Sequence, residues 1–267
     1  MAESKKIVVR NGTVHGTKHA QLHINNQDAC LSTTFRIPAL NTSYAVGLVS
    51  DGCTGIPRFS RTEVGSNLLV TFAYSRIQEF ICAGIPVADI PRSLFQAVTE
   101  FIRDLTLKIM PSHIHWPYPS NIKGRETYTG TRRFQADYLS ATLLGFITDH
   151  KDLVTFSSGD GIIMVDNMIT VIDQNDRPSY PSYSINDPGQ GFDINVYGME
   201  DVTRLAIMTD GPKELLKHDK GFLDRMFTHL PMNPLGLDIL LKVTATKLGH
   251  LMHDDCTAVT LEKKVSS

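Results

Sequence analysis

The sequence predicts an α+β fold in which two antiparallel sheets pack together and helices cover them on the outside. Groups of apolar, β-branched segments with strand character occupy both the N-terminal part and the middle of the chain. Two long segments with helical periodicity separate these groups, and another helix precedes a last strand. Strand groups that alternate with helix groups in this way are best satisfied by packed antiparallel sheets with helices outside.

The N-terminal part predicts an antiparallel group of strands. We expect short strands at 6–9 and 20–24, separated by an Asn-Gly turn and a polar link. A strand at 29–35 and a Pro-containing turn come next, before the apolar segment 44–49. This last segment reads as a buried strand, which delivers Asp51 to a glycine-containing loop.

The period of the apolar residues then changes to that of amphipathic helices. Between 61 and 83 they recur at three- and four-residue steps, which predicts a first helix. A second helix is predicted to begin at Ile90-Pro91, because proline is favoured in the first turn. Residues 111–133 are rich in Pro, Gly, Ser and Tyr, so we expect a long surface connection there.

The second half of the chain predicts another antiparallel group of strands, followed by helices and a final strand. The expected strands are 138–148, 153–157, 162–166, 168–173 and 256–261. The expected helices are 212–218 and 234–250. The polar, proline-rich stretch 176–191 predicts a loop close to the strand that leads to Asp210.

Composition indicates a soluble, enzyme-sized protein. The 267 residues are 42% hydrophobic and 20% charged, and we expect one catalytic domain over 1–267. The net charge of -2 and the dispersed Lys and Arg residues give no basic surface for nucleic acid or anionic membranes. No apolar run approaches the roughly 20 residues that span a bilayer, and the polar start MAESKK lacks the apolar h-region that a signal peptide has. We expect a cytoplasmic protein; the oligomeric state has no sequence signal.

Cysteine and histidine give weak signals for a metal site. The four cysteines contain no C-x-x-C pair, so we expect reduced thiols rather than bridges or zinc ligands. The ten histidines are scattered, and the short spacings at His113-Ile114-His115 and His250-x-x-His253 have no Cys or Glu partner. The sequence therefore argues against a histidine-based metal site.

Acidic residues, in contrast, recur where predicted strands end. Three apolar segments run into Asp51-Gly52, Asp160-Gly161 and Asp210-Gly211, and Asp254-Asp255 directly precedes the last strand. Each dipeptide taken alone is an ordinary turn signal. Four such sites together suggest a cation site, because a carboxylate at the end of a core strand needs a partner. Oxygen donors without histidine or cysteine suit hard cations such as Mg²⁺ or Mn²⁺.

These acidic sites belong to motifs that resemble a known family. The motifs are Asn-Gln-Asp (26–28), Val-Ser-Asp-Gly-Cys-Thr-Gly (49–55, with 60–65 after it), Ser-Gly-Asp-Gly (158–161), Met-Thr-Asp-Gly (208–211) and Asp-Asp-Cys-Thr (254–257). Their order and spacing over nearly the whole chain resemble the type-2C metal-dependent protein phosphatases, the PPM family. The compact size looks most like the short bacterial branch.

The resemblance implies a four-layer α-β-β-α sandwich with a metal centre at one end of the paired sheets. It also implies two Mn²⁺ or Mg²⁺ ions, bridged by Asp51, and a third, weaker ion. The implied metal ligands are Asp51, Gly52 through its backbone carbonyl, Asp210, Asp254 and, for the third ion, Asp160. Asp28 would act through metal-bound waters.

The implied reaction is the hydrolysis of phosphoserine and phosphothreonine in protein substrates by a metal-bridging hydroxide. Three residues depart from the family pattern. Gln27 replaces a Glu, and Cys53 stands where eukaryotic members carry a His. His23 stands five residues before Asp28, where the family commonly has a phosphate-clamping Arg, so we expect His23 to serve there with less charge. Arg36 or Arg58 could supply the missing cation.

Two other functions stay open at the level of the sequence. One is a non-catalytic phosphoprotein-binding or regulatory module on the same fold, which Gln27 and His23 keep open. The other is a two-metal phosphodiesterase, although the lack of a basic balance argues against nucleic acid as its substrate. Retention of the core carboxylates favours the phosphatase.

Overall fold

The computed structural model describes residues 5–53, 61–109, 131, 134–174, 179–186, 189–228 and 233–265. The strands of these residues form two five-stranded antiparallel sheets. The first sheet has the order β1 (Lys5–Val14), β10 (Cys256–Val265), β9 (Arg204–Met208), β6 (Gly161–Val165) and β7 (Met168–Ile172). The second has the order β2 (Ala29–Ile37), β3 (Thr42–Ser50), β4 (Leu143–Thr148), β5 (Asp152–Ser158) and β8 (Asp193–Gly198).

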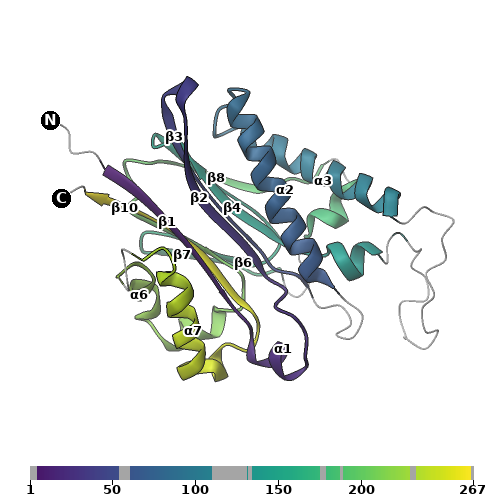
Figure 1. The fold of residues 1–267 in the computed structure, drawn as a ribbon, viewed down its shortest axis with the longest axis vertical. Helices are drawn as coiled ribbons and strands as arrows, with labels where there is room; N and C mark the ends of the chain where they lie inside the picture. Colours follow the sequence, from purple (N-terminus) through teal and green to yellow (C-terminus); the bar gives the residue numbers. More distant parts are fainter. Residues whose placement is uncertain are drawn as a thin grey trace.

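Helices cover the outer face of each sheet (Figure 1). Those on the second sheet are α2 (Thr62–Cys82) and α3 (Ile90–Ile109). Those on the first sheet are α5 (Lys213–His218), α6 (Phe222–Thr228) and α7 (Gly236–Leu248). The remaining helical segments are α1 (Thr17–Gln21), η1 (Pro38–Leu40), the π-helix η2 (Gln135–Leu139), η3 (Pro181–Asn186) and η4 (Gly249–Leu251). No helix among the described residues has the length and apolar character needed to cross a membrane.

Side chains along the central strands point alternately to the two faces of each sheet, and this alternation produces the layers of the sandwich. In β3, Ala45 and Val49 point into the core between the sheets, whereas Val46 and Leu48 pack beneath α2 and α3. In β9, Leu205 and Ile207 point into the same central core, and the alternate residues pack under α6 and α7. Because both faces of these strands are covered, their sequences are continuously apolar. The predicted four-layer α-β-β-α sandwich is confirmed.

The helical periodicity located α2 and α3 correctly, but the predicted strand at 20–24 is wrong. The Asn-Gly dipeptide does not turn the chain, because β1 continues through it, with Asn11 opposite Val259 and Gly12 opposite Ala258 on β10. The chain leaves the sheet only after Val14 and forms α1. Pairing along the whole length of β10 thus overrides a local turn preference.

Other boundaries differ as well. The expected strand 138–148 begins as the π-helix η2, and only Leu143–Thr148 is strand. Neither β8, an edge strand with an exposed outer face, nor the short helix α6 was predicted from the sequence. Part of the expected loop 176–191 folds as η3, and residues 111–130 of the expected surface connection lie outside the described residues.

Candidate metal centre and active site

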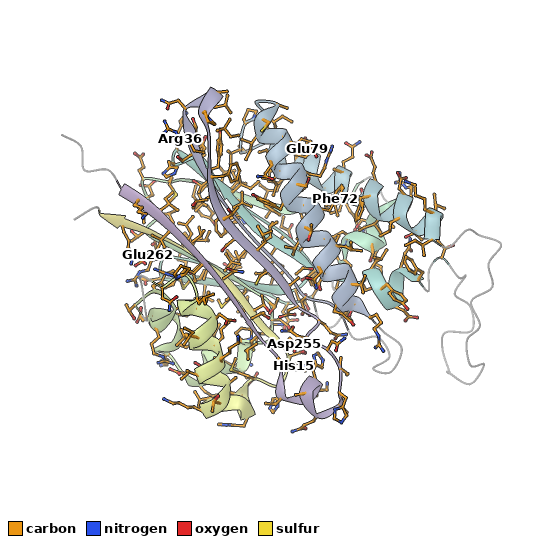
Figure 2. The ribbon with its side chains drawn as sticks, viewed as in Figure 1. His15, Arg36, Phe72, Glu79, Asp255 and Glu262 are labelled. Atoms are coloured by element: carbon orange, nitrogen blue, oxygen red, sulfur yellow. The ribbon has the colours of Figure 1, made fainter. Side chains whose placement is uncertain are left out.

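The strand registers bring the acidic motifs to one end of the sandwich. Ala29 on β2 pairs with Ser50 on β3, so Asp28 just before one strand lies beside Asp51 just after the other. Ile162 on β6 pairs with Met208 on β9, which places Asp160 and Asp210 at the matching end of the other sheet. Figure 2 shows Asp255, just before β10, at this end, whereas Glu262 lies farther along the same strand.

A cavity of about 600 Å³ opens where these ends meet. Its lining includes the predicted metal ligands Asp51, Gly52, Asp160, Asp210 and Asp254. The other residues of the lining are Lys18, His19, Cys53, Thr142, Ser179, Tyr180, Tyr183 and Gln190. All five predicted ligands therefore reach one space, although they come from both sheets.

Asp28 and Asp51 form the most strongly perturbed carboxylate pair of the site. Asp28 is only 6% exposed, and burial together with the Asp255 charge raises its pKa to about 8. Burial and then the negative charges of Asp28, Asp210 and Asp254 raise the pKa of Asp51 well above its ordinary value. The two carboxyl groups lie within hydrogen-bonding reach of each other, so the ionisation of both is unfavourable unless a cation lies nearby.

A polar network fixes one side of Asp28 and leaves the other side without a donor. Thr209 Oγ1 donates to Asp28 Oδ2 over 2.8 Å and accepts the backbone N–H of Thr257 over 3.1 Å. No amide or hydroxyl donor among the described residues reaches Asp28 Oδ1, which is buried. A buried acceptor in this state is costly unless a cation, or water held by one, satisfies it.

Gly52 allows the close packing behind Asp51. A side chain there would collide with the backbone, since a Cβ would lie 2.8 Å from the carbonyl oxygen of Gln27 and 2.9 Å from that of Thr62. The backbone N–H of Asp51 donates to Thr142 Oγ1 over 2.9 Å, and the Asp51 carbonyl accepts the N–H of Thr142 over 2.8 Å. The loop that presents Asp51 to the cavity is therefore held on both sides.

A positive charge lies beside Asp210, one of the residues that line the cavity. Lys213 Nζ, on α5, lies 3.3 Å from Asp210 Oδ2 and 3.8 Å from Asp173 Oδ2. Burial by itself would lower the pKa of Lys213, but the Asp210 carboxylate and its hydrogen bond raise it. Burial raises the pKa of Asp160, and the Lys213 ammonium partly opposes that rise. The Lys213 ammonium therefore neutralises part of the negative charge at the predicted third metal position.

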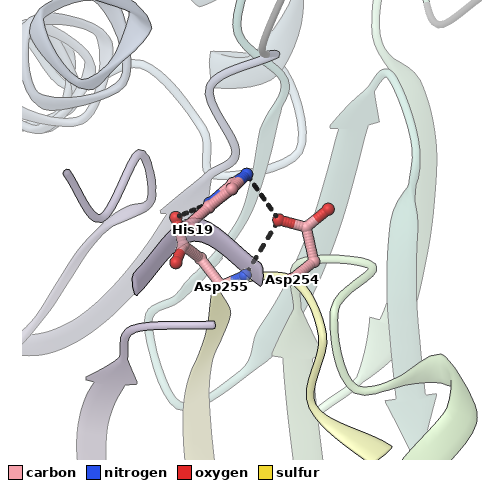
Figure 3. Close-up of side chains that lie close together, drawn as sticks. All are labelled: His19, Asp254 and Asp255. Carbon is pink, nitrogen blue, oxygen red and sulfur yellow. Dashed lines mark hydrogen bonds and ion pairs between the residues drawn. The ribbon is translucent and has the colours of Figure 1, made fainter. Parts of the chain in front are cut away.

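His19 links the two acidic residues that precede β10 (Figure 3). Its Nδ1 lies 2.9 Å from Asp255 Oδ2, and its Nε2 lies 3.4 Å from Asp254 Oδ1. Burial by itself would lower the pKa of His19, but the hydrogen bond to Asp255 and the surrounding carboxylates raise it. Burial likewise raises the pKa of Asp254, an effect that the charge of His19 opposes.

Asp255 holds this part of the site together. It is 2% exposed, and it accepts the backbone N–H of Gly16 over 2.7 Å and that of Gln27 over 2.6 Å in addition to the His19 ring. Gly16 must be small, because a Cβ there would lie 2.2 Å from the carbonyl carbon of Asp254. The segment around α1 is thus fixed directly against the start of β10.

The structure places the predicted phosphate-binding cations differently from the metal ligands. His23 is exposed, has a left-handed φ of 55°, and is not among the described residues that line the cavity. Arg36 donates to Asn41 over 2.5 Å at the far end of β2, and Arg58 lies outside the described residues. Lys18 and His19 on α1 line the cavity instead. Neither was selected from the sequence, because no metal-ligand spacing surrounds them.

Gln27 and Cys53, the other departures from the family pattern, have defined places. Gln27 is buried, and its side-chain amide donates to Thr62 Oγ1 over 3.0 Å at the start of α2. Cys53 lines the cavity beside Tyr180. Burial and then the Cys53 side chain raise the pKa of Tyr180, so this residue keeps its hydroxyl proton. Gln27 therefore has a structural contact, whereas Cys53 and Tyr180 border the substrate space.

The residues present fit divalent cations. The donors are carboxylates on Asp51, Asp210 and Asp254, with the Gly52 backbone beside them, and such oxygen donors suit Mg²⁺ and Mn²⁺. The perturbed Asp28–Asp51 pair and the donor-free Asp28 Oδ1 call for positive charge at the same place. A divalent cation would satisfy both requirements.

Comparisons with known proteins identify the family and the fold. A sequence model of the protein phosphatase 2C family matches residues 15–245. No curated protein matches the sequence significantly. Among solved structures, a bacterial serine phosphatase is similar with a TM-score of 0.62 and 14% identity, over 98% of this chain and 100% of that one.

Two further solved structures share the fold. The serine/threonine phosphatase Stp1 from Staphylococcus aureus has a TM-score of 0.60 and 14% identity, over 99% of this chain and 98% of that one. The catalytic domain of the serine threonine protein phosphatase PstP, in complex with two manganese ions, has a TM-score of 0.58 and 12% identity, over 97% and 99% of the two chains. The match to the family model covers most of the sequence, and the chain belongs to the protein phosphatase 2C family, which confirms the predicted enzyme class of protein phosphatase.

Proposed function

We propose that this chain is a metal-dependent protein serine/threonine phosphatase that acts on phosphomonoesters through two Mn²⁺ or Mg²⁺ ions. The observation that carries the proposal is the Asp28–Asp51 pair, whose negative charge is unfavourable without a cation and whose Asp28 Oδ1 has no amide or hydroxyl donor among the described residues. Family membership and the two manganese ions named for the PstP structure support the same chemistry.

In this proposal Asp51, the Gly52 carbonyl, Asp210 and Asp254 would hold the two ions. When bound, the ions lower the pKa of a shared water and neutralise charge on the phosphoryl group. The protein supplies fixed positions for these donors, because Asp51 is held through Thr142 and Asp254 through Asp255. Asp28, held by Thr209, orients water next to Asp51.

The phosphoprotein substrate would approach through the open side of the cavity. Lys18 is exposed and lines this side, so its ammonium can attract the phosphate dianion. His23, the cation predicted from the sequence motif, is exposed outside the cavity lining. We therefore assign the first phosphate contact to Lys18 and keep His23 as a second candidate.

We propose two ions rather than three as the working state. Asp160 and Asp210 could hold a third, weaker ion, but Lys213 already lies 3.3 Å from Asp210. A cation would have to compete with this tethered ammonium. We further propose that residues 1–267 act as one catalytic domain.

The test is hydrolysis of p-nitrophenyl phosphate and of a phosphothreonine peptide with Mn²⁺ or Mg²⁺. We expect metal-dependent turnover in the wild type and a loss of at least about 1,000-fold in D51N and D210N, because the neutral amides hold the ions poorly. D219N is the matched control, since Asp219 pairs with Arg225 and does not line the cavity. A wild type that stays inert with every metal while still binding phosphopeptide would contradict catalysis and indicate the non-catalytic module.

A further inference from the structure

We infer that His19 is a direct ligand of the ion that Asp254 holds, so that this metal centre contains an imidazole nitrogen as well as oxygen donors. The inference rests on the proposed metal centre and adds a residue that the acidic motifs do not include. Three independent features of His19 carry it: its partner on one ring nitrogen, the position of the other nitrogen, and the rigidity of the backbone beneath it.

The first feature is the hydrogen bond on Nδ1. Asp255 accepts two backbone N–H groups, from Gly16 and Gln27, so its carboxylate is an acceptor and His19 Nδ1 must carry the hydrogen between them. Histidines that bind metals almost always donate their other ring N–H to a carboxylate or carbonyl in this way. In the neutral ring Nε2 is then the ligating atom. If the ring is doubly protonated, the Nε2 proton goes to water when the cation binds.

The second feature is the position of Nε2. This atom lies 3.4 Å from Asp254 Oδ1, and Figure 3 shows the other Asp254 oxygen turned away from the ring. Two donor atoms that each lie about 2.1 Å from one cation are about 3.0 to 3.4 Å apart when the donor–cation–donor angle is about 90 to 109°. The distance between His19 Nε2 and Asp254 Oδ1 is therefore that of two ligands of one ion.

The third feature is the backbone that carries the ring. His19 is 5% exposed, although it borders the cavity. The N–H groups of Thr17 and Lys18 donate to the carbonyls of Met252 and His253 over 3.0 and 2.9 Å, and Gly16 packs against Asp254. The ring is thus fixed relative to Asp254 before any metal binds, and such preorganisation favours a ligand role.

A nitrogen ligand changes which metal the site prefers. Mg²⁺ demands oxygen ligands and keeps much of its water, whereas imidazole suits first-row transition metals. We therefore expect His19 to raise the affinity for Mn²⁺ and Co²⁺ with little effect on Mg²⁺. The sequence argued against a histidine-based site because its closely spaced histidines have no Cys or Glu partner. A single histidine that joins carboxylates from distant segments leaves no such spacing pattern.

The experiment is pulsed electron paramagnetic resonance of the full chain loaded with Mn²⁺, which detects the ¹⁴N nucleus of a ligating imidazole. We expect nitrogen modulation in the wild type and in the control H218Q, an exposed histidine on α5, and its loss in H19Q. Titration should give Mn²⁺ binding that is about 10- to 100-fold weaker in H19Q, with a change of less than about threefold for Mg²⁺.

The outcomes separate this inference from the proposed function. Wild-type protein that binds Mn²⁺ without nitrogen modulation overturns the role of His19 and leaves the phosphatase proposal standing. Wild-type protein that binds no Mn²⁺ overturns the metal centre itself. If H19Q does not fold, as judged by circular dichroism, D255N replaces it: weaker Mn²⁺ binding with the nitrogen modulation retained supports the inference, and unchanged Mn²⁺ affinity contradicts it.

Discussion

Two pairs of carboxylates at this end of the sandwich have different surroundings. Asp28 and Asp51, the deeper pair, have no lysine or arginine charge among the causes that perturb their pKa values, and Asp28 is buried. Asp160 and Asp210, the outer pair, lie beside Lys213, whose ammonium group is 3.3 Å from Asp210. The Asp210 side chain is also 33% exposed, so water screens its charge.

The comparison indicates which carboxylates create the requirement for metal. A carboxylate with an ammonium partner and contact with water can ionise in the folded protein on its own. Asp28, which is 6% exposed, lacks both aids, and Asp51 has no ammonium partner among the described residues, so ionisation of the pair is coupled to the binding of an external cation. We therefore expect the deeper pair to create the requirement for metal. The outer pair should affect only how tightly the weaker, third metal position binds.

The largest expected effect is a pH-dependent stability of the metal-free protein. The folded-state pKa of Asp28, about 8, is above its ordinary value of 3.8, so between these values the folded form holds a proton that the unfolded chain has released. The free energy of unfolding should therefore fall as the pH rises from 5 to 8, by at least about 1.4 kcal/mol, equivalent to one pKa unit. Urea denaturation in chelator at both pH values measures this.

Two further measurements test whether Asp28 causes this pH dependence of stability. D28N should show a smaller loss of stability between pH 5 and 8, because the amide does not ionise. Saturating Mn²⁺ should restore stability most strongly at pH 8, by about 2.7 kcal/mol at 100 times the Kd. An equally steep fall in D28N would assign the pH dependence to other groups.

An intermediate effect is expected when Asp28 loses its hydroxyl partner. T209V removes the donor to Asp28 Oδ2, and a buried acceptor without its donor costs about 1 to 3 kcal/mol. We expect metal-free T209V at pH 8 to unfold at lower urea concentration than the wild type. With Mn²⁺ bound, T209V should lose turnover roughly tenfold. T170V on the exposed face of β7 is the control, and equal effects of the two variants would remove the special role of Thr209.

The smallest effect is expected in the outer pair. K213Q removes the ammonium beside Asp210 and Asp173, so a divalent cation no longer competes with it. We expect the weakest Mn²⁺ site to bind about three- to tenfold more tightly, which isothermal titration calorimetry measures. K217Q, whose lysine is exposed and pairs with Glu214, should leave that site unchanged. Unchanged binding in K213Q would show that Lys213 does not compete for the third position.

Local sequence predicted those parts of the molecule that short-range periodicity controls. Helices α2 and α3 followed from apolar residues at helical steps, and the central strands followed from continuous apolar runs. The strand ends drew attention to Asp51, Asp160, Asp210 and Asp254, and the family motifs added Asp28; the register that pairs Ala29 with Ser50 then brings Asp28 beside Asp51. The strand predicted at 20–24 failed because β10, far away in sequence, extends β1 beyond the Asn-Gly dipeptide.

The sequence by itself determined the layered α+β fold, the acidic strand ends and the family motifs. Only the tertiary structure decided how those carboxylates are partnered. The His19–Asp255 contact spans 236 residues, and Thr209 reaches Asp28 across 181. Such contacts have no local periodicity or spacing. They arise because two sheets and a short helix meet at one end, where buried carboxylates must find hydrogen-bond donors or cations.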